Sequence, residues 1–522
     1  MAQPSAQSRF FTTQSGVSPY LVRWHQAFSP RKADSGPLVE LWFDRQDAPP
    51  LREAVCLPRR LDSHTLHMAA LYLTALLNNK LCVWGARRVS LVSQDAALAQ
   101  EFLQRVTDLF LYKAAVFSDL TPYFILALHK KRYGEQLILD TDQAQAARLA
   151  RLFAQPAATA SPAAPPARHS VLAVNIGQFK TSSALVSLDG TGGYALSREH
   201  RQETWPNGQP YCYPLLAEQA MAAMARNLGP LPPEVEAVCC SLAGPVVKEV
   251  PYGVAQVGLY AACSQDVADG MGQALIDAAE AAFPGRPVFL INDADAQGLF
   301  ASRFCRQSPD PDVPGYTTNL LSIRFGACPS VSYIDAAGRN MPRLNEYPWL
   351  VTTVHGGRPD APLFSTISPY ISFHGIGNIA HELGLLEKYG VSPNDAAACF
   401  HDCFTSDNPA RQRDAFKVYY VLGAHIAMLA SEIDRDTPLR HVQLLGSDAN
   451  KLDEPVFTAI WNGFADFIDH HALPFTGVDF TLAEGTSASA SLVGAAVAYA
   501  DKVAEKGKMP PTAGQDAPEP QS

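Results

Sequence analysis

Two short apolar runs separated by a polar turn form the most informative stretch of the chain, residues 171–189. The first run is interrupted by Asn175 and ends before Gly177, and the second run ends at Leu188. Apolar runs of this length, bounded by glycine and polar residues, predict two strands joined by a turn. The backbone N–H groups of such a turn, with Lys180 beside it, suit phosphate oxygens. An ordinary surface hairpin would show the same pattern, so the stretch alone leaves both interpretations open.

The region 36–153 alternates between short apolar runs and longer stretches whose apolar residues recur at helical spacing. Strands alternating with helices predict an α/β layer structure. The region contains neither a phosphate loop nor a metal-ligand spacing, so its sequence does not indicate its function. The predicted strands are 38–43, 89–92, 124–128 and 136–139, and the predicted helices are 63–79, 96–117 and 143–153.

The region 169–505 shows the same alternation, and several of its predicted strands end in small or polar residues. Gly244 follows one strand, Asn292-Asp293 follow the next, and Gly446-Ser447 follow a third. Ligands bind to α/β sheets where strands end and give way to helices. The predicted strands are 236–242, 287–291, 319–323, 330–334 and 441–445, and the predicted helices are 267–283, a helix ending near 304, 415–433 and 486–500.

Asp293 is the strongest single candidate for chemistry, because it stands where a strongly apolar strand gives way to a helix. The dipole and the free N–H groups of a helix N-terminus keep a carboxylate ionised. An ionised carboxylate can accept the proton of a substrate hydroxyl as the oxygen attacks phosphorus. The alternative is that Asn292 or Asp293 is only a helix N-cap.

Composition divides the chain into parts. The segment 154–168 is rich in alanine and proline and predicts a linker, and residues 506–522 predict a disordered tail. Residues 1–35 are polar, with proline and serine, and we expect them to be poorly ordered. A chain of 522 residues is long enough for about three domains. We therefore predict an α/β domain over 36–153 and a larger body over 169–505.

Charge and cysteine usage exclude several function classes. The net charge of −10 argues against a nucleic-acid partner, since phosphate binding needs a basic face. No apolar run reaches the ~18–20 residues of a membrane span, and the first residues lack the apolar region of a signal peptide. Ten cysteines without a CxxC pair indicate reduced thiols in a cytosol. We therefore expect a cytoplasmic protein that binds neither nucleic acid nor membrane.

The order of these pieces, from Val171 to Asp501, resembles the ROK family within the actin/hexokinase/Hsp70-like ATPase superfamily. VLAVNIGQFKTSSALVSLDG resembles the first phosphate motif, and VFLINDADAQ resembles the segment of the catalytic aspartate. CSLAGPVV is similar to a turn near the sugar, and LNEYPWLVT to the segment whose glutamate contacts the sugar. HVQLLGSDAN and SASLVGAAVAYA resemble the adenosine strand and the closing helix.

The resemblance implies an α/β, two-lobed, actin/hexokinase-like (ribonuclease H-like) ATPase fold, preceded by the smaller α/β domain. It implies an ATP-dependent phosphotransferase that acts on a hydroxyl of a sugar or sugar-like molecule, uses ATP and Mg²⁺, and forms a homo-oligomer, a dimer. Asp293 would be the general base, with Gly244, Asn292 and Glu346 near the substrate. The residues implied along the nucleotide and its phosphates are Asn175, Gly177, Lys180, Thr181, Gly326, Gly446 and Ser447.

The chain departs from the family pattern at both phosphate motifs. Asn175 stands where the family has an aspartate that helps to hold Mg²⁺, and an amide offers a hard cation no charge. In the second motif RFGACPS replaces a run of glycines, so that only Gly326 is flexible and Pro329 has no N–H. Trp349 replaces a zinc-binding histidine, and the zinc loop, at 356–370, has no cysteine, so no structural zinc is expected.

Two hypotheses therefore remain open. The first is a kinase of the ROK type, and the second is a catalytically degenerate sugar- or nucleotide-binding sensor or scaffold. The altered phosphate motifs favour the second, whereas Asn292, Asp293 and Glu346 favour a retained ligand pocket in either case. A repressor would need a helix-turn-helix before the body, and the alternating N-terminal region does not predict one. Nucleotide binding would separate the two hypotheses.

Overall fold

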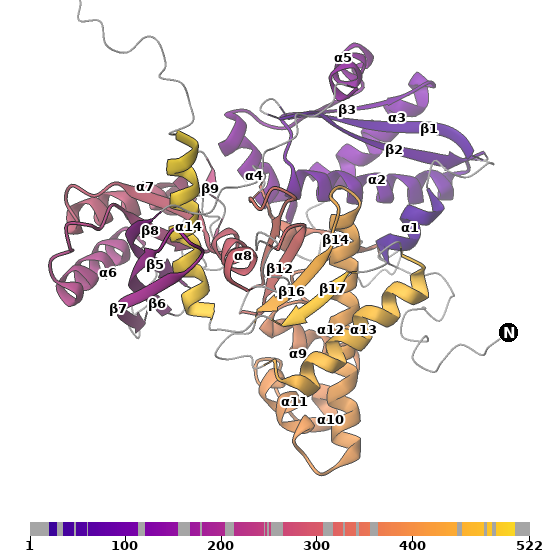
Figure 1. The fold of residues 1–522 in the computed structure, drawn as a ribbon. Coiled ribbons are helices and arrows are strands. Elements are labelled where there is room, and N and C mark those ends of the chain that lie inside the picture. The colour runs from indigo at the N-terminus through magenta and orange to yellow at the C-terminus, as the bar shows by residue number, and fades with distance from the viewer. Residues whose placement is uncertain are drawn as a thin grey trace, which may run out of the picture. The chain divides into compact units, whose positions relative to one another are not determined.

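The chain divides into two compact units in this computed structural model (Figure 1), and each unit is described by itself. Unit 1 comprises Met1–Ala160, Thr318–Ala336 and Asn340–Ser487, and unit 2 comprises Ser161–Thr317, Ala337–Arg339 and Ala488–Ser522. The structure describes residues 20–28, 35–45, 48–59, 61–112, 121–154, 168–177, 180–203, 213–244, 246–247, 250–251, 265–305, 317–326, 329–340, 344–354, 364–445, 452–473, 478–482 and 487–506.

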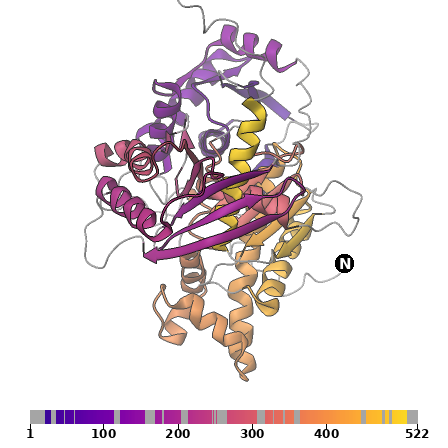
Figure 2. The same cartoon turned by 60° about the vertical axis from the view of Figure 1, so that its left-hand side comes forward.

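A five-stranded sheet organises unit 2 (Figure 2), with the spatial strand order β11-β8-β5-β6-β7. β6 pairs antiparallel with β5 on one side and with β7 on the other, whereas β8 and β11 run parallel to β5. A three-stranded meander joined by two parallel strands is the ribonuclease H-like arrangement that the resemblance implies. The strands are β5 (His169–Ile176), β6 (Lys180–Leu188), β7 (Tyr194–Glu203), β8 (Val238–Leu242) and β11 (Val288–Asn292).

Parallel strands need long crossover connections, and in unit 2 these connections contain helices. The chain passes through α6 (Tyr213–Leu228) before β8 and through α7 (Gln265–Ala282) before β11. Both helices pack on the sheet, where Met221 and Met271 join Leu172 and other strand residues in one apolar core. β5 and β8 therefore read as nearly continuous apolar runs, because helices and sheet bury them together.

Two further helices of unit 2 cross at a close approach of their backbones. They are α8 (Asp293–Phe304) and α14 (Ser487–Lys506). A Cβ atom on Gly494 would lie 1.7 Å from the carbonyl oxygen of Ala296, so only glycine fits there. Beside the crossing, Gln297 donates a buried hydrogen bond of 2.8 Å to the hydroxyl of Ser491.

A four-stranded sheet with the order β13-β12-β16-β17 forms one part of unit 1. β12 and β13 form an antiparallel hairpin, and β16 and β17 run parallel to β12. The strands are β12 (Leu320–Arg324), β13 (Ser330–Ile334), β16 (His441–Leu445) and β17 (Asp479–Leu482), and the helices between them include α12 (Pro409–Asp434) and α13 (Glu454–His471). A Cβ atom on Gly463 would lie 1.8 Å from the Tyr420 carbonyl oxygen, and one on Gly423 would lie 2.0 Å from that of Ile460.

The N-terminal region of unit 1 has a sheet of its own, with the order β2-β1-β3-β4. Its long helix α2 (Ser63–Val83) is buried from Ala69 to Val83, as expected for a helix that is apolar on all sides. The other elements are β1 (Ser35–Asp44), β2 (Leu51–Pro58), β3 (Arg88–Ser93), β4 (Ile138–Asp140), α3 (Ala96–Thr107), the π-helical η2 (Asp108–Tyr112), α4 (Thr121–Tyr133) and α5 (Gln143–Phe153).

Several short elements complete the described structure. In unit 2 they are β9 (Val246–Val247) and β10 (Val250–Pro251). In unit 1 they are α1 (Leu21–Ala27), the 3₁₀ helix η5 (Tyr347–Trp349), β14 (Val351–Val354), β15 (Phe364–Thr366), α9 (Phe373–Glu382), α10 (Leu385–Tyr389) and α11 (Ala396–Phe404).

The α/β class predicted from the sequence is confirmed, with one wrong element and one shortened element. The predicted strand at 124–128 is part of helix α4, since a short apolar run does not distinguish a buried strand from a buried helix. The helix predicted over 96–117 is α-helical only to Thr107 and continues as η2.

The predicted division into domains stays a prediction. The structure places residues 36–153 in the same compact unit as Asn340–Ser487. The predicted tail, 506–522, lies outside the described residues except for Lys506, which ends α14, and so does most of the predicted linker, 155–167. Within the described part of the chain, no helix is long and apolar enough to cross a membrane.

Candidate functional site

Three parallel strands of unit 2 end in register at one edge of the sheet. Leu242 of β8 pairs with Ile176 of β5 on one side and with Asn292 of β11 on the other. The residues that follow, Gly177 and Asp293 among them, therefore leave the sheet at this common edge. We call this the carboxyl edge of unit 2, the place where α/β sheets bind ligands.

Asn292 is the N-cap of α8 and also ties two strands together. Its Oδ1 accepts the N–H groups of Ala294 at 2.9 Å and Asp295 at 3.2 Å. Its Nδ2 donates to the carbonyl oxygen of Gly244 at 2.8 Å, where Gly244 has a φ of 119° that favours glycine. Asn292 is therefore a helix N-cap, and its predicted place near the substrate stays a prediction. Asp293 begins the helix with a partly buried side chain, where the helix dipole favours a carboxylate.

Asn175 is buried and its amide oxygen already has a protein partner. The hydroxyl of Ser241, on β8, donates to Oδ1 of Asn175 at 2.9 Å, and the two residues pair in register. The sequence analysis missed Ser241. Its position before the predicted turn at Ala243-Gly244 was the available signal, because side chains near strand ends lie near the ligand edge.

The turn between β5 and β6 is tight, and its flanking side chains differ in exposure. The N–H of Gly177 donates to the Lys180 carbonyl oxygen at 3.1 Å, and a Cβ on Gly177 would lie 2.9 Å from that oxygen. Lys180 is exposed, whereas Thr181 is buried and pairs with Ile176. Of the predicted phosphate contacts here, Lys180 therefore presents its side chain to solvent. Residues 178–179 lie outside the described residues.

The remaining candidates belong to unit 1. Gly326 follows β12, and the N–H of Phe325 donates to the carbonyl oxygen of Leu445, the last residue of β16, at 3.2 Å. Gly446 and Ser447 come directly after β16 and lie outside the described residues. Glu346 is buried before η5, and its N–H donates to the Cys82 carbonyl oxygen of α2 at 3.1 Å.

The described thiols favour structural over chemical roles. Cys239 and Cys240 lie buried in β8, between β11 and β5 of the unit 2 sheet, and burial raises the pKa of Cys240 to about 12. All described cysteines are free. Among the described residues there is no group of three or more His, Cys, Asp or Glu side chains that could hold a metal ion.

The candidate residues thus fall into two sets. The structure brings together Asn175, Gly177, Lys180, Thr181, Gly244, Asn292 and Asp293 at the carboxyl edge of unit 2. It places Gly326 and Glu346 in unit 1. Their roles, the ATP and Mg²⁺ requirement, the lack of structural zinc, the dimer and the cytoplasmic location stay predictions.

No protein-family model matches the chain, and no curated protein matches it in sequence. Similar solved structures include a ROK family protein from Streptococcus pneumoniae TIGR4 in complex with sucrose, with 16% identity, covering 64% of this chain and 99% of that chain, at a TM-score of 0.47. A ROK family glucokinase from Streptomyces griseus in complex with glucose and AMPPNP has 16% identity, covering 63% and 98%, at a TM-score of 0.41.

A ROK family transcriptional regulator, a homologue of the E. coli MLC protein, is also similar. It has 15% identity, covering 85% of this chain and 99% of that chain, at a TM-score of 0.45. These similar solved structures are thus described as ROK proteins, among them a glucokinase and a transcriptional regulator.

Proposed function

We propose that this protein binds a sugar-like molecule and transfers a phosphoryl group from ATP to one of its hydroxyls, with Asp293 as the general base. The observation that supports this most is the carboxyl edge of unit 2, where three parallel strands end in register. That edge presents a carboxylate at a helix N-terminus, and the tight turn beside it carries the exposed Lys180.

The chemistry follows from the position of Asp293. Its carboxylate accepts the hydroxyl proton while the hydroxyl oxygen forms a bond to the γ-phosphorus of ATP. At the same time the bond between the γ-phosphorus and the β,γ-bridging oxygen breaks, and ADP leaves. ATP supplies the phosphoryl group when bound, and in unit 2 Lys180 and the backbone at Gly177 would lie along its phosphates. Carboxylate oxygens suit Mg²⁺, and Asp295, in the same first turn of α8, would supply one while Asp293 acts as the base.

One observation favours the second candidate, a protein that binds its ligand without turnover. The Oδ1 atom of Asn175 accepts a hydrogen bond from Ser241 in a buried position. A neutral amide held in this way offers Mg²⁺ no charge, so the metal would need a charged ligand elsewhere, such as Asp295. The two candidate functions both predict ligand binding, and they differ in whether a phosphoryl group is transferred.

Asp293→Asn tests the proposal, with glucose as the first of a panel of hexoses. The substitution keeps the size of the side chain and removes the base. We expect ATP- and Mg²⁺-dependent phosphorylation to fall by about 10²–10⁴-fold. Hexose affinity, measured by calorimetry, should stay within about threefold, because the amide can still hydrogen-bond a hydroxyl.

Asn227→Asp in α6 is a matched control, since Asn227 lies on an exposed part of unit 2. Undiminished turnover in Asp293→Asn would remove Asp293 from the base role. Hexose binding by the wild type without any phosphorylation would favour the second candidate.

A further inference from the structure

The C-terminal turn of α2 binds the backbone of the segment that carries Glu346. The last carbonyl groups of a helix have no partner within the helix and need one outside it. The Val83 carbonyl oxygen accepts the N–H groups of Leu344 at 3.0 Å and Asn345 at 3.3 Å, and the Cys82 carbonyl oxygen accepts that of Glu346 at 3.1 Å. Three successive N–H groups of the candidate ligand segment therefore serve to cap a helix of the N-terminal region.

Two asparagines one turn earlier in α2 hold the far end of the same segment. Asn78 donates to the Trp349 carbonyl oxygen at 3.0 Å. Asn79 accepts the N–H of Val351 at 2.7 Å and donates to the carbonyl oxygen of Val351 at 2.9 Å. The side chain of Asn79 thus bonds to both backbone groups of one residue, as a neighbouring strand would. Residues 344–351 are held at both ends by α2, with Glu346 between them.

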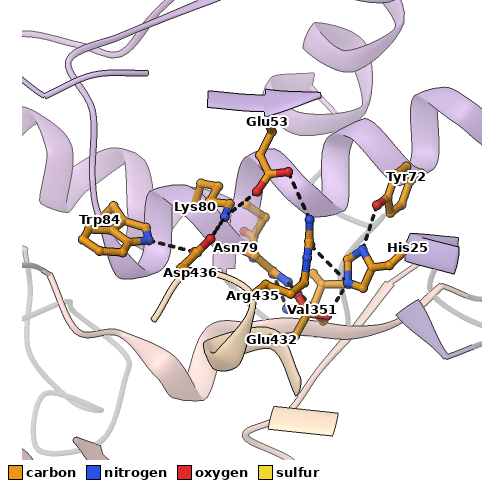
Figure 3. Close-up of polar contacts among 11 residues, drawn as sticks. His25, Glu53, Tyr72, Asn79, Lys80, Trp84, Val351, Glu432, Arg435 and Asp436 are labelled. Atoms are coloured by element: carbon orange, nitrogen blue, oxygen red, sulfur yellow. Dashed lines mark hydrogen bonds and ion pairs between the residues drawn. The ribbon is translucent and has the colours of Figure 1, made fainter. Parts of the chain in front are cut away.

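A buried network of charges fixes Asn79 in turn (Figure 3). The carboxylate of Glu432, at the end of α12, accepts from Asn79 at 2.9 Å and lies 2.5 Å from His25 of α1. Arg435 pairs with Glu53 of β2 at 3.0 Å. A buried polar group is costly unless it is bonded, and the network gives Asn79 a partner on each side.

The network extends along α2 to the next residue. Lys80 pairs with Glu53 at 2.5 Å and with Asp436, which also accepts from the indole of Trp84 at 2.9 Å. Burial alone would raise the pKa of Asp436, but Lys80 and Arg435 outweigh this effect, so its pKa lies below the ordinary value. For Glu432, His25 and Arg435 lower the pKa in the same way against burial. The carboxylates are therefore ionised, and their partners stay bound at neutral pH.

We infer that α2 is a positioning element of the substrate site, and that Asn79 is the positioning residue which holds the Glu346 segment through Val351. The inference rests on the proposed function and on the prediction, implied by the resemblance, that Glu346 contacts the sugar. It assigns a role to the N-terminal region, whose sequence indicates none. The inference is supported by the contacts of Asn79 with Val351 and with Glu432, which bring together three distant parts of the chain. All three residues belong to unit 1.

Asn79→Ala in the full-length protein tests this inference by two measurements. The substitution leaves both backbone groups of Val351 without their side-chain partner. We expect amide hydrogen exchange of peptides covering 344–354 to become about tenfold faster or more. The Kd and KM for the hexose found with the wild type, glucose first, should rise about tenfold, while KM for ATP stays within about twofold. A general loss of structure would not separate the two KM values.

Thr74→Val is the matched control, since Thr74 is buried in α2 and bonds only to the Ala70 carbonyl of its own helix. This variant should leave the exchange of 344–354 unchanged. Unchanged exchange in Asn79→Ala would overturn the inference. If Asn79→Ala fails to fold, the same measurements can be made on Asn78→Ala. That variant removes the hydrogen bond from Asn78 to the Trp349 carbonyl oxygen and leaves Asn79 in place.

The two proposals fail in different ways. If no hexose binds the wild type, the proposed function is wrong, while faster exchange of 344–354 in Asn79→Ala still supports α2 as the element that holds this segment. If hexose binds but Asn79→Ala weakens neither the hexose nor the protection of 344–354, the positioning role is wrong and the proposed function stands. Glu346→Gln, which keeps the backbone contacts to α2, should weaken hexose binding without changing the exchange of 344–354.

Discussion

Units 1 and 2 contain the same strand plan but bury different kinds of residue. The order β6-β5-β8-β11 in unit 2 recurs as β13-β12-β16-β17 in unit 1, each time as an antiparallel hairpin followed by two parallel strands. The buried titratable groups of the unit 2 sheet are thiols, Cys239 and Cys240, whose pKa burial raises. Unit 1 instead buries histidines with lowered pKa values and the charge network around Lys80 and Glu432, whereas unit 2 has the partly buried Arg303–Asp501 ion pair. One strand plan can thus be stabilised in ways that respond differently to pH.

The histidines of unit 1 make this difference measurable. Burial lowers the pKa of His129 to about 4 and that of His425 to about 3. His425 stacks on Tyr370, with 4.1 Å between the ring centroids. The other described histidines with lowered pKa values, His25, His441, His470 and His471, also belong to unit 1.

The largest expected effect is a loss of stability of unit 1 in mild acid. A histidine with a lowered folded pKa is neutral in both states above pH ~6.5, and below it only the unfolded state gains the proton. Stability is therefore complete above pH ~6.5 and falls as the pH drops. By pH 5 the loss is about 2 kcal/mol for each fully buried histidine, or about 4 kcal/mol for His129 and His425 together.

Urea unfolding followed by tryptophan fluorescence measures this loss, because five of the six tryptophans belong to unit 1. His425→Phe keeps a ring against Tyr370 and should reduce the slope of stability against pH by up to about 1.4 kcal/mol per pH unit. Equal acid sensitivity of peptides from the two units in hydrogen exchange would contradict the comparison.

The second expected effect is shared by both units, because each packs two helices through a glycine. Gly463→Ala in unit 1 and Gly494→Ala in unit 2 each place a Cβ less than 2 Å from a backbone carbonyl oxygen. We expect each to destabilise its own unit by about 2–3 kcal/mol through overpacking. Gly270→Ala in α7, where a Cβ would meet nothing within 4 Å, is the control and should stabilise by up to about 1 kcal/mol.

Exchange measured peptide by peptide locates each loss. Destabilisation of only one unit by Gly463→Ala, and of the other by Gly494→Ala, is the expected result. If Gly463→Ala or Gly494→Ala left stability unchanged, the two helices at that crossing could move apart at little cost. The close backbone approach would then not distinguish that crossing from the open position of Gly270.

The sequence predicted what local patterns determine. The Gly177 turn, the strand ending at Asn292 and the helix beginning at Asp293 follow from apolar runs and punctuating residues, and all three are present. The α4 helix was mistaken for a strand, because a short apolar run fits either element.

The sequence could not predict contacts between distant segments. Asn79 looks like a surface residue at the end of a helix, and only the fold brings it to Val351, 272 residues away. Ser241 was likewise hidden, since its partner Asn175 lies on a neighbouring strand, 66 residues earlier. Such pairs depend on strand order and helix packing, which hydrophobic periodicity alone does not encode.

The smallest expected effect concerns the position at which the two sheets differ most directly. In unit 2 the register pairs Asn175 with Ser241, and the corresponding pair in unit 1, two residues before its turn glycine, is Arg324 with Leu445. Ser241→Ala removes the hydroxyl that donates to the buried Asn175 oxygen and should destabilise unit 2 by about 1 kcal/mol.

A double-mutant cycle with Asn175→Leu isolates this pair. Replacing both partners by apolar groups leaves no unpaired buried oxygen, so the double variant should lose less stability than the sum of the two single variants. Additive losses would mean that the hydrogen bond contributes nothing to stability. An uncharged side chain would then be present at position 175 for another reason. A carboxylate at position 175 would still accept the Ser241 hydroxyl, more strongly than the amide does, and would also offer Mg²⁺ a negative charge. If the carboxyl edge of unit 2 holds the metal, Asn175→Asp with Ser241 retained should therefore raise the Mg²⁺-dependent affinity for the nucleotide.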